Sequence, residues 1–139
     1  HTVLRLNIYK SLKLFGIDEI SFLDGIQHHT KSADQITSEI GDIVMARKDM
    51  AASYHLSIVV DDADQKITQI IRGEDLREAT FIHILLQKIL GFATPIYQHH
   101  RLIRDDAGKR LAKRDDARAI AKYREDGISP MDVKRMVGL

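Results

Sequence analysis

Residues 67–100 read ITQIIRGEDLREATFIHILLQKILGFATPIYQHH, and this stretch decides the fold. It begins with an isoleucine-rich run at 67–71 and ends with a second short apolar run that starts at Pro95. Between them, apolar residues recur at helical spacing from about residue 78 or 80 to residue 90, and Gly91 stands where a left-handed residue ends many helices. Strand, helix and strand in this order predict an α/β layer with a right-handed crossover, in which ligands collect at the carboxyl ends of the strands.

Short elements are predicted on both sides of this stretch. They are a helix at Ile8–Phe15 between Asn7 and Gly16, strands at 20–23, 43–46 and 54–60, a loop or weak helix at 28–39, a helix at 117–125 and a last helix capped by Ser129. The strand at 54–60 is predicted from its β-branched residues, and it is near enough to 67–71 to pair with it. No linker or repeat divides the chain, so we expect one domain.

The composition is that of an ordinary globular protein, with 44% hydrophobic and 29% charged residues in 139. The 21 basic and 20 acidic residues nearly cancel, so no overall polycation drives binding to nucleic acid. The absence of cysteine excludes disulfides and thiolate metal ligands. No apolar run reaches membrane-spanning length and no signal peptide is visible, so we expect a cytoplasmic monomer without a membrane partner.

A basic segment follows the decisive stretch. Asp105 to Gly108 has the residues of a turn, and the cations after it are Lys109, Arg110, Lys113 and Arg114. A glycine-anchored cationic loop suits a polyphosphate whose charge rearranges during reaction. On these residues alone, a solvated basic turn is the better interpretation. The excess of basic residues from Arg101 to Arg124 has the same two interpretations, a site for ATP and the end of a tRNA or a solvated face.

Several motifs recur in an order that resembles a known family. They are YHLSIVVDD at 54–62, IRGEDL at 71–76, AT at 79–80, LG at 90–91, PIY at 95–97, HH at 99–100 and RLAKR at 110–114. The set resembles the second half of the Rossmann-like catalytic domain of class I glutamyl-tRNA synthetases, followed by short helices, and most of all their short paralogues that act on queuosine in tRNA(Asp). Residues 110–114 stand at the family's KMSKS loop; Arg110 replaces its first Lys and Ala112 its Ser, while Lys113 keeps its second Lys.

The resemblance implies a ligase that activates L-glutamate with ATP and Mg²⁺ and transfers it to tRNA, probably tRNA(Asp). It implies that Lys113 is catalytic and that Arg110, Leu111, Ala112, Lys113 and Arg114 bind ATP. The family's HIGH signature and zinc-binding cysteines belong to an amino-terminal half that this chain lacks. We therefore expect residues 1–139 to be a single partial catalytic domain with little or no activity alone.

Arg72 and Tyr54 are the residues that the resemblance places against glutamate. An arginine before Gly73 at a strand end offers a fork that matches a carboxylate bidentately, and a phenol at residue 54 both donates a hydrogen bond and walls a pocket. On chemistry alone, a surface ion pair of Arg72 with Glu74 or Asp75 and a half-buried Tyr54 at the end of a strand are the better interpretations. The resemblance reverses that choice.

Other candidates have ordinary explanations. Asp61-Asp62 suit Mg²⁺, but we expect them to cap the end of the strand at 54–60, and the resemblance gives them no metal role. His28-His29 suggest a metal, but adjacent histidines in a polar stretch are more often exposed. His83, inside the helix at 78–90, is interpreted as a side chain at the edge of the core rather than a catalyst. We assign no metal site to this chain.

Two other functions compete with glutamate transfer to queuosine. The first is a discriminating glutamyl-tRNA synthetase that charges the acceptor end of tRNA; a long helical domain after residue 139 would favour it. The second is a noncatalytic phosphate- or RNA-binding module, which predicts salt-dependent RNA binding without any dependence on glutamate.

Overall fold

The computed structural model describes residues 2–104, 107–108, 111 and 119–138. The chain forms two compact units, residues 1–100 and residues 101–139, and each is considered by itself. In the described residues, no helix has both the length and the apolar character needed to cross a membrane.

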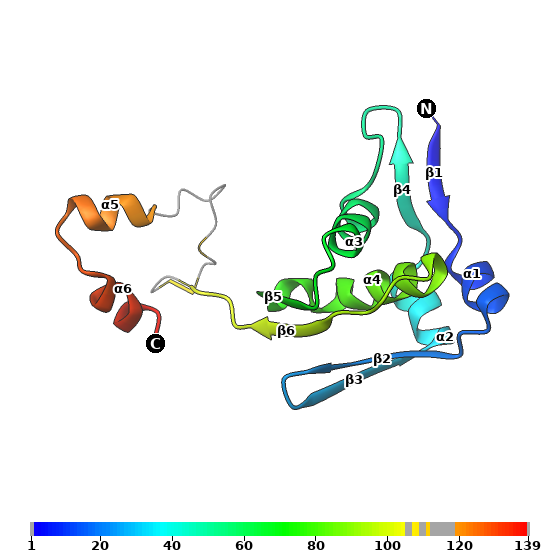
Figure 1. The fold of residues 1–139 in the computed structure, drawn as a ribbon, viewed down its shortest axis with the longest axis horizontal. Coiled ribbons are helices and arrows are strands. Elements are labelled where there is room, and N and C mark those ends of the chain that lie inside the picture. The colour runs from blue at the N-terminus through cyan, green and yellow to red at the C-terminus, as the bar shows by residue number, and fades with distance from the viewer. Residues whose placement is uncertain (1, 105–106, 109–110, 112–118, 139) are drawn as a thin grey trace. The chain divides into compact units, whose positions relative to one another are not determined.

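The first unit is built on a four-stranded sheet of order β3-β2-β6-β5 (Figure 1). β2 (Glu19–Asp24) and β3 (Gln27–Ser32) form an antiparallel hairpin, while β5 (Gln69–Gly73) and β6 (Ile96–His100) run parallel with Arg72 opposite His99. β2 is also parallel to β6, through the pair Asp24 and Tyr97. The carboxyl ends of three parallel strands are therefore neighbours.

The predicted order of strand, helix and strand is confirmed. After β5, a 3-10 turn (η2, Glu74–Leu76) leads into α4 (Arg77–Leu90), which ends at Gly91 with a φ of 71°. The core joins α4 to the sheet and to the amino-terminal elements. Its buried members are Ile8, Leu12, Ile20, Phe22, Ile36, Ile43, Phe81, Ile84, Leu85 and Tyr97. The amino-terminal end of α4 is thus fixed beside the carboxyl ends of the strands.

The predicted strand at 54–60 is wrong, because these residues form the helix α3 (Tyr54–Asp64), which packs on α4. Ser53 caps it by accepting a hydrogen bond from the Leu56 amide at 3.3 Å. The cap and the packing on α4 outweigh the weak strand preference of the β-branched residues. The predicted pairing of 54–60 with 67–71 is therefore also wrong, and Asp61 and Asp62 lie within a helix rather than at the end of a strand.

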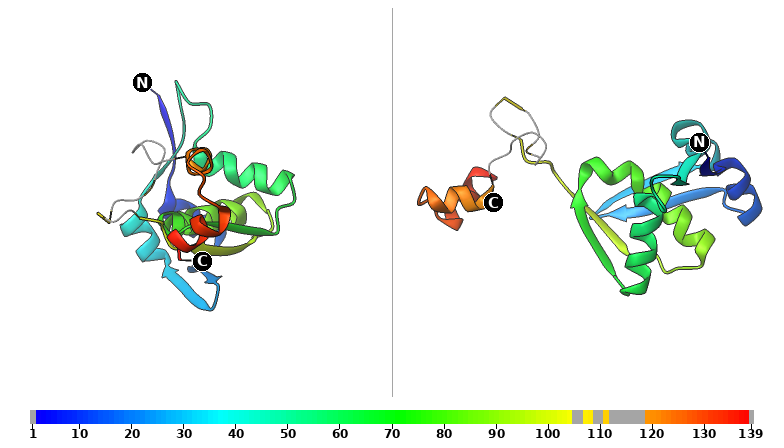
Figure 2. Two further views of the ribbon diagram at one scale, coloured as in Figure 1. Left: turned by 90° about the vertical axis from the view of Figure 1, so that its left-hand side faces the viewer. Right: turned by 90° about the horizontal axis from the view of Figure 1, so that it is seen from above.

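The remaining elements of this unit are short. β1 (Val3–Leu6) and β4 (Ile43–Arg47) lie side by side as a second, antiparallel sheet (Figures 1 and 2). The predicted helix α1 (Ile8–Phe15) is confirmed, with Asn7 as its cap and Gly16 in the left-handed region. The loop or weak helix expected at 28–39 is only partly right: β3 occupies its first part, and α2 (Ala33–Gln35) and the π-helical turn η1 (Ile36–Ile40) follow.

The second unit contains two described helices, α5 (Ile120–Glu125) and α6 (Pro130–Met136). The predicted start of α6 is confirmed, since Ser129 and Asp132 form a capping box around Pro130. Ala119 precedes α5 in an extended conformation, so the described part of the helix predicted at 117–125 begins later than expected.

Candidate anion-binding site

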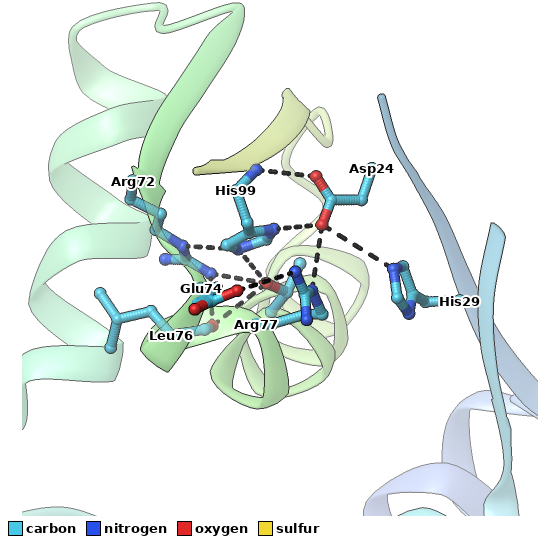
Figure 3. A network of polar contacts seen from close by, with 8 residues as sticks. Asp24, His29, Arg72, Glu74, Leu76, Arg77 and His99 are labelled. Carbon is cyan, nitrogen blue, oxygen red and sulfur yellow. Dashed lines mark hydrogen bonds and ion pairs between the residues drawn. The ribbon is translucent and has the colours of Figure 1, made fainter. Parts of the chain in front are cut away.

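Polar side chains gather where the parallel strands end (Figure 3). Asp24 is the last residue of β2, while Arg72 and His99 lie next to the last residues of β5 and β6. Thr80 and His83 come from the first turns of α4, one turn apart on the same face. In sheets of this kind, the carboxyl ends of the strands form the usual ligand site.

The guanidinium of Arg72 lies at the centre of this group. Its Nε donates to His99 Nε2 at 3.2 Å, and its Nη1 lies 3.0 Å from His83 Nδ1. Its Nη2 donates to Thr80 Oγ1 at 2.7 Å and to the Leu76 carbonyl at 3.2 Å. The ring of Tyr97 lies beneath it, 5.1 Å from Cζ. The cation is thus held on several sides by groups without charge.

The contacts of Arg72 fix the proton positions on two histidines. A guanidinium only donates hydrogen bonds, so His99 Nε2 and His83 Nδ1 must be unprotonated acceptors. His99 therefore carries its proton on Nδ1 and donates it to Asp24 Oδ2 at 3.0 Å. His83 carries its proton on Nε2 and donates it to His55 Nδ1 at 3.0 Å. Both imidazoles are neutral.

Burial and the charge of Arg72 keep these rings neutral. Burial, followed by the charge of Arg72 and the neighbouring His55, lowers the pKa of His83 to about 3. Burial also lowers the pKa of His99, although its hydrogen bond to Asp24 acts in the opposite direction. For His55 the causes are burial and then Arg72, and the pKa is again lowered. At neutral pH the three rings add no charge to the site.

Asp24 anchors the far side of the group. Its Oδ1 accepts from the His99 backbone amide at 2.7 Å and its Oδ2 accepts from Arg77 Nε at 3.1 Å. Burial raises the pKa of Asp24, but the hydrogen bonds from His99 and Arg77 outweigh burial and leave the pKa below its ordinary value. His29 Nε2 lies 3.8 Å from Oδ2, which is longer than a hydrogen bond.

Tyr54, the first residue of α3, meets the same guanidinium. Burial lowers the pKa of Arg72, and the hydrogen bond that the guanidinium donates to the Tyr54 phenol oxygen is among the interactions that oppose this effect. Tyr54 is 50% exposed, and the centroid of its ring lies 6.0 Å from that of His83. The two residues that the sequence predicted for one pocket are therefore brought together, although Tyr54 opens a helix and not a strand.

Among the residues that the structure describes, Arg72 has no carboxylate as a direct ion-pair partner. Its hydrogen-bond acceptors are imidazole, hydroxyl and carbonyl groups. Glu74, an expected partner, lies 3.9 Å from Arg77 Nη2. A fixed, half-buried cation of this kind binds a carboxylate or another small anion.

The bidentate grip predicted for Arg72 has a structural obstacle. A guanidinium has five N–H donors, and the contacts with His99, His83, Thr80 and Leu76 engage both of its edges. The hydrogen bond with Tyr54 takes a further N–H group, so an anion would meet the Tyr54 hydroxyl and would displace one of the present acceptors of Arg72.

Most of the predicted phosphate contacts lie outside the described residues. Arg110, Ala112, Lys113 and Arg114 belong to this group. Leu111 is described; its amide donates to the Ile103 carbonyl at 3.0 Å and its side chain is exposed.

The two histidines at 28 and 29 lie on opposite faces of β3. His28 is exposed as expected, but the ring of His29 is largely covered and stacks on Phe22, with ring centroids 5.1 Å apart. Among the described residues, no group of three or more His, Cys, Asp or Glu side chains is arranged to hold a metal ion.

Sequence reasoning missed several members of the site. They are Asp24, His55, Thr80, His83 and His99. A signal existed for Thr80 and His83, because their spacing places both on the helix face that begins with Leu76. His83 was assigned to the edge of the core, whereas it is 1% exposed and binds Arg72 directly.

The fold and this site define a class: an α/β domain whose parallel strands end at a fixed cation suited to an anionic ligand. A family model described as tRNA synthetases class I (E and Q), catalytic domain, matches residues 12–139. The chain belongs to this family, which confirms the resemblance and the predicted fold class.

Individual relatives agree with this assignment. A glutamyl-Q tRNA(Asp) synthetase of Rhodobacter capsulatus is 51% identical over 138 residues, which cover 99% of this chain and 49% of that protein. A glutamate–tRNA ligase of Synechococcus sp. is 42% identical over 99 residues, or 71% of this chain and 21% of that protein. A crystal structure of a glutamate tRNA ligase from Elizabethkingia meningosepticum, in complex with its amino acid, has a TM-score of 0.58 and 31% identity, covering 70% of this chain and 19% of that one. The chain thus spans about half the length of its Rhodobacter relative.

Proposed function

We propose that the protein containing this chain is a ligase that activates L-glutamate with ATP and transfers it to queuosine of tRNA(Asp). The observation that carries the proposal is the fixed, positively charged Arg72 beside Tyr54 at the carboxyl ends of the strands. The name of the relative that is 51% identical, glutamyl-Q tRNA(Asp) synthetase, supports the choice of acceptor.

In this proposal, Arg72 and Tyr54 bind the side-chain carboxylate of glutamate. The phenol hydroxyl and an Arg72 N–H group released from one of its present acceptors donate to its oxygens, and the cation supplies the complementary charge. Glutamine has the same shape but no charge, so it leaves a half-buried guanidinium without its counter-ion and is rejected.

Activation needs no nucleophilic side chain, because the α-carboxylate of glutamate itself attacks the α-phosphorus of ATP. Pyrophosphate leaves, and negative charge builds on the phosphate oxygens. We assign the stabilisation of this charge to Lys113, with Arg110 and Arg114 beside it and Leu111 and Ala112 completing the loop around ATP. Mg²⁺ arrives bound to the phosphates. Ala112 has no hydroxyl for a further hydrogen bond.

The domain content, oligomeric state and location of the protein are proposed as well. Residues 1–139 are taken as a single partial catalytic domain of a cytoplasmic monomer, with the HIGH motif and zinc ligands on the part of the protein outside this chain. A second function, charging of the tRNA acceptor end, is favoured by the names of the Synechococcus and Elizabethkingia relatives.

Transfer of labelled glutamate by the full-length protein distinguishes the two functions. The acceptors are tRNA(Asp) carrying queuosine, tRNA(Asp) lacking it, and tRNA(Glu). We expect label only on tRNA(Asp) that carries queuosine. Lys113→Ala should lower the rate roughly 10²–10³-fold, which is the usual effect of removing one electrostatic contact from an active site. Label on the 3′ end of tRNA(Glu) would establish the second function instead, and transfer unaffected by Lys113→Ala would remove the role given to that residue.

A further inference from the structure

The way in which the half-buried Arg72 is held differs from the usual environment of a cation that is partly removed from water. Charged side chains that leave water are generally paired with an opposite charge. Around Arg72, the positions next to the guanidinium are taken by the imidazoles of His83 and His99 and by the hydroxyl of Thr80. These acceptors satisfy the geometry of the N–H groups without cancelling the charge.

Each imidazole is itself fixed by a second partner. The Nδ1 proton of His99 is bound by Asp24, and the ring is 0% exposed. The Nε2 proton of His83 is bound by His55, and His83 lies in the buried face of α4. Neither ring can rotate without breaking a hydrogen bond at each end, so each aims one nitrogen lone pair at Arg72.

The acid of this group does not neutralise Arg72. Asp24 is separated from the guanidinium by the His99 ring, and it forms its own ion pair with Arg77 at 3.1 Å. The pair of Asp24 and Arg77 has no net charge, and His55, His83 and His99 are neutral. Among the described residues, the charge of Asp62 also acts on Arg72, but it raises the Arg72 pKa less than Tyr97 and Tyr54 do.

We infer that His83 and His99 are positioning residues that determine selectivity: they fix Arg72 through neutral nitrogen acceptors and so reserve its positive charge for the carboxylate of an acidic amino acid. The inference rests on the proposed function, because glutamate is the ligand that the charge would select. A carboxylate in place of either imidazole would still hold Arg72, but it would neutralise the charge of Arg72 in the protein without ligand.

Two substitutions at one position separate charge from shape. In His83→Asn the amide oxygen lies where Nδ1 lies now, so a neutral acceptor for Arg72 Nη1 is retained. His83→Asp has the same shape and one negative charge more. His28→Asp adds the same charge at an exposed position of β3, the strand at the other edge of the sheet from β5, and serves as the control.

The measurement is calorimetric binding of glutamate and of glutamine to the full-length protein, with folding checked by thermal melting. We expect His83→Asp to bind glutamate roughly 10- to 100-fold more weakly than His83→Asn, the range of a charge-assisted contact. Glutamine affinity should be similar in the two variants, so the preference for glutamate over glutamine falls in the Asp variant alone. His28→Asp should keep the wild-type preference.

The outcomes are separable. Equal glutamate affinities of the Asn and Asp variants, whether high or low, would overturn the inference, because charge at residue 83 would then have no effect. The proposed function would still stand in that case if the wild type binds glutamate. Failure of the wild type to bind glutamate would overturn the proposed function and the inference with it. If His83→Asp does not fold, the pair His99→Gln and His99→Glu makes the same comparison at Arg72 Nε.

Discussion

The two histidines that contact Arg72 are distant from it in the sequence. His99 lies 27 positions away and His83 lies 11, yet each accepts a hydrogen bond from the same guanidinium on a ring nitrogen. The cation repels a proton on either ring, and burial acts in the same direction. The two effects support each other: the histidines hold the Arg72 guanidinium in place, and the positive charge of Arg72 keeps the histidines neutral.

This arrangement makes stability depend on pH in a defined direction. The pKa of His83 is about 3 in the folded protein and 6.5 when the group is free. Between these values the unfolded chain binds a proton that the folded chain does not, so the contribution of His83 is complete above pH 6.5 and is lost as the pH falls towards 3. From pH 7.5 to 5 this loss is roughly 2 kcal/mol.

The substitution His83→Asn tests this dependence. Asparagine does not titrate, so the free energy of unfolding of the variant should fall by roughly 2 kcal/mol less than that of the wild type between pH 7.5 and 5. Urea unfolding at a series of pH values measures the difference. Parallel curves for the two proteins would mean that His83 titrates normally in the folded state.

At this scale, sequence reasoning selected Arg72 and Tyr54 but not the residues that hold them in place. Arg72 and Tyr54 stand in motifs that resemble the family, and the structure brings them together. His83 was assigned to the edge of the core because a histidine on an apolar helix usually has no other role. Only the crossover that places α4 beside the ends of β5 and β6 shows that it faces a cation.

Among the elements, α3 determines where Tyr54 and His55 lie. Both belong to its first turn, and the helix begins there because Ser53 caps it. The β-branched run that predicted a strand is a weak signal, whereas a cap and a helix to pack against are strong ones. In contrast, β5, α4 and β6 were predicted correctly, because a long helical period bounded by Gly91 leaves little ambiguity.

Removing the cap of α3 should affect both stability and binding. Ser53→Ala leaves the Leu56 amide without its acceptor, which costs about 1 kcal/mol in the free energy of unfolding. Because the first turn holds Tyr54 and His55 against the Arg72 site, we expect glutamate affinity to fall as well.

Asn7→Ala is the matched control. It removes the cap of α1, where Asn7 accepts from the Lys10 amide at 2.8 Å, and α1 contributes nothing to the contacts of Arg72. Its loss of stability should be similar, at about 1 kcal/mol, with glutamate affinity retained. Equal glutamate affinities of the two variants would show that the start of α3 does not position the site.

At the scale of the whole molecule, the chain corresponds to about half the length of a relative. It spans 49% of the Rhodobacter protein, and the described residues of its first unit supply the proposed amino-acid site. Sequence patterns predicted an α/β sheet from the crossover alone. They did not predict that β3 would extend this sheet, because the polar residues at 27–32 form a hairpin strand with only one covered face.

The central claim is that the charge of Arg72 selects glutamate for activation. Its most direct test is the exchange of label between pyrophosphate and ATP by the full-length protein, measured with glutamate and with glutamine for the wild type and for Arg72→Ala. We predict exchange with glutamate and none with glutamine, and a loss of roughly 10²-fold in kcat/KM for glutamate in the variant. Exchange supported equally by glutamine, or undiminished in Arg72→Ala, would contradict the claim.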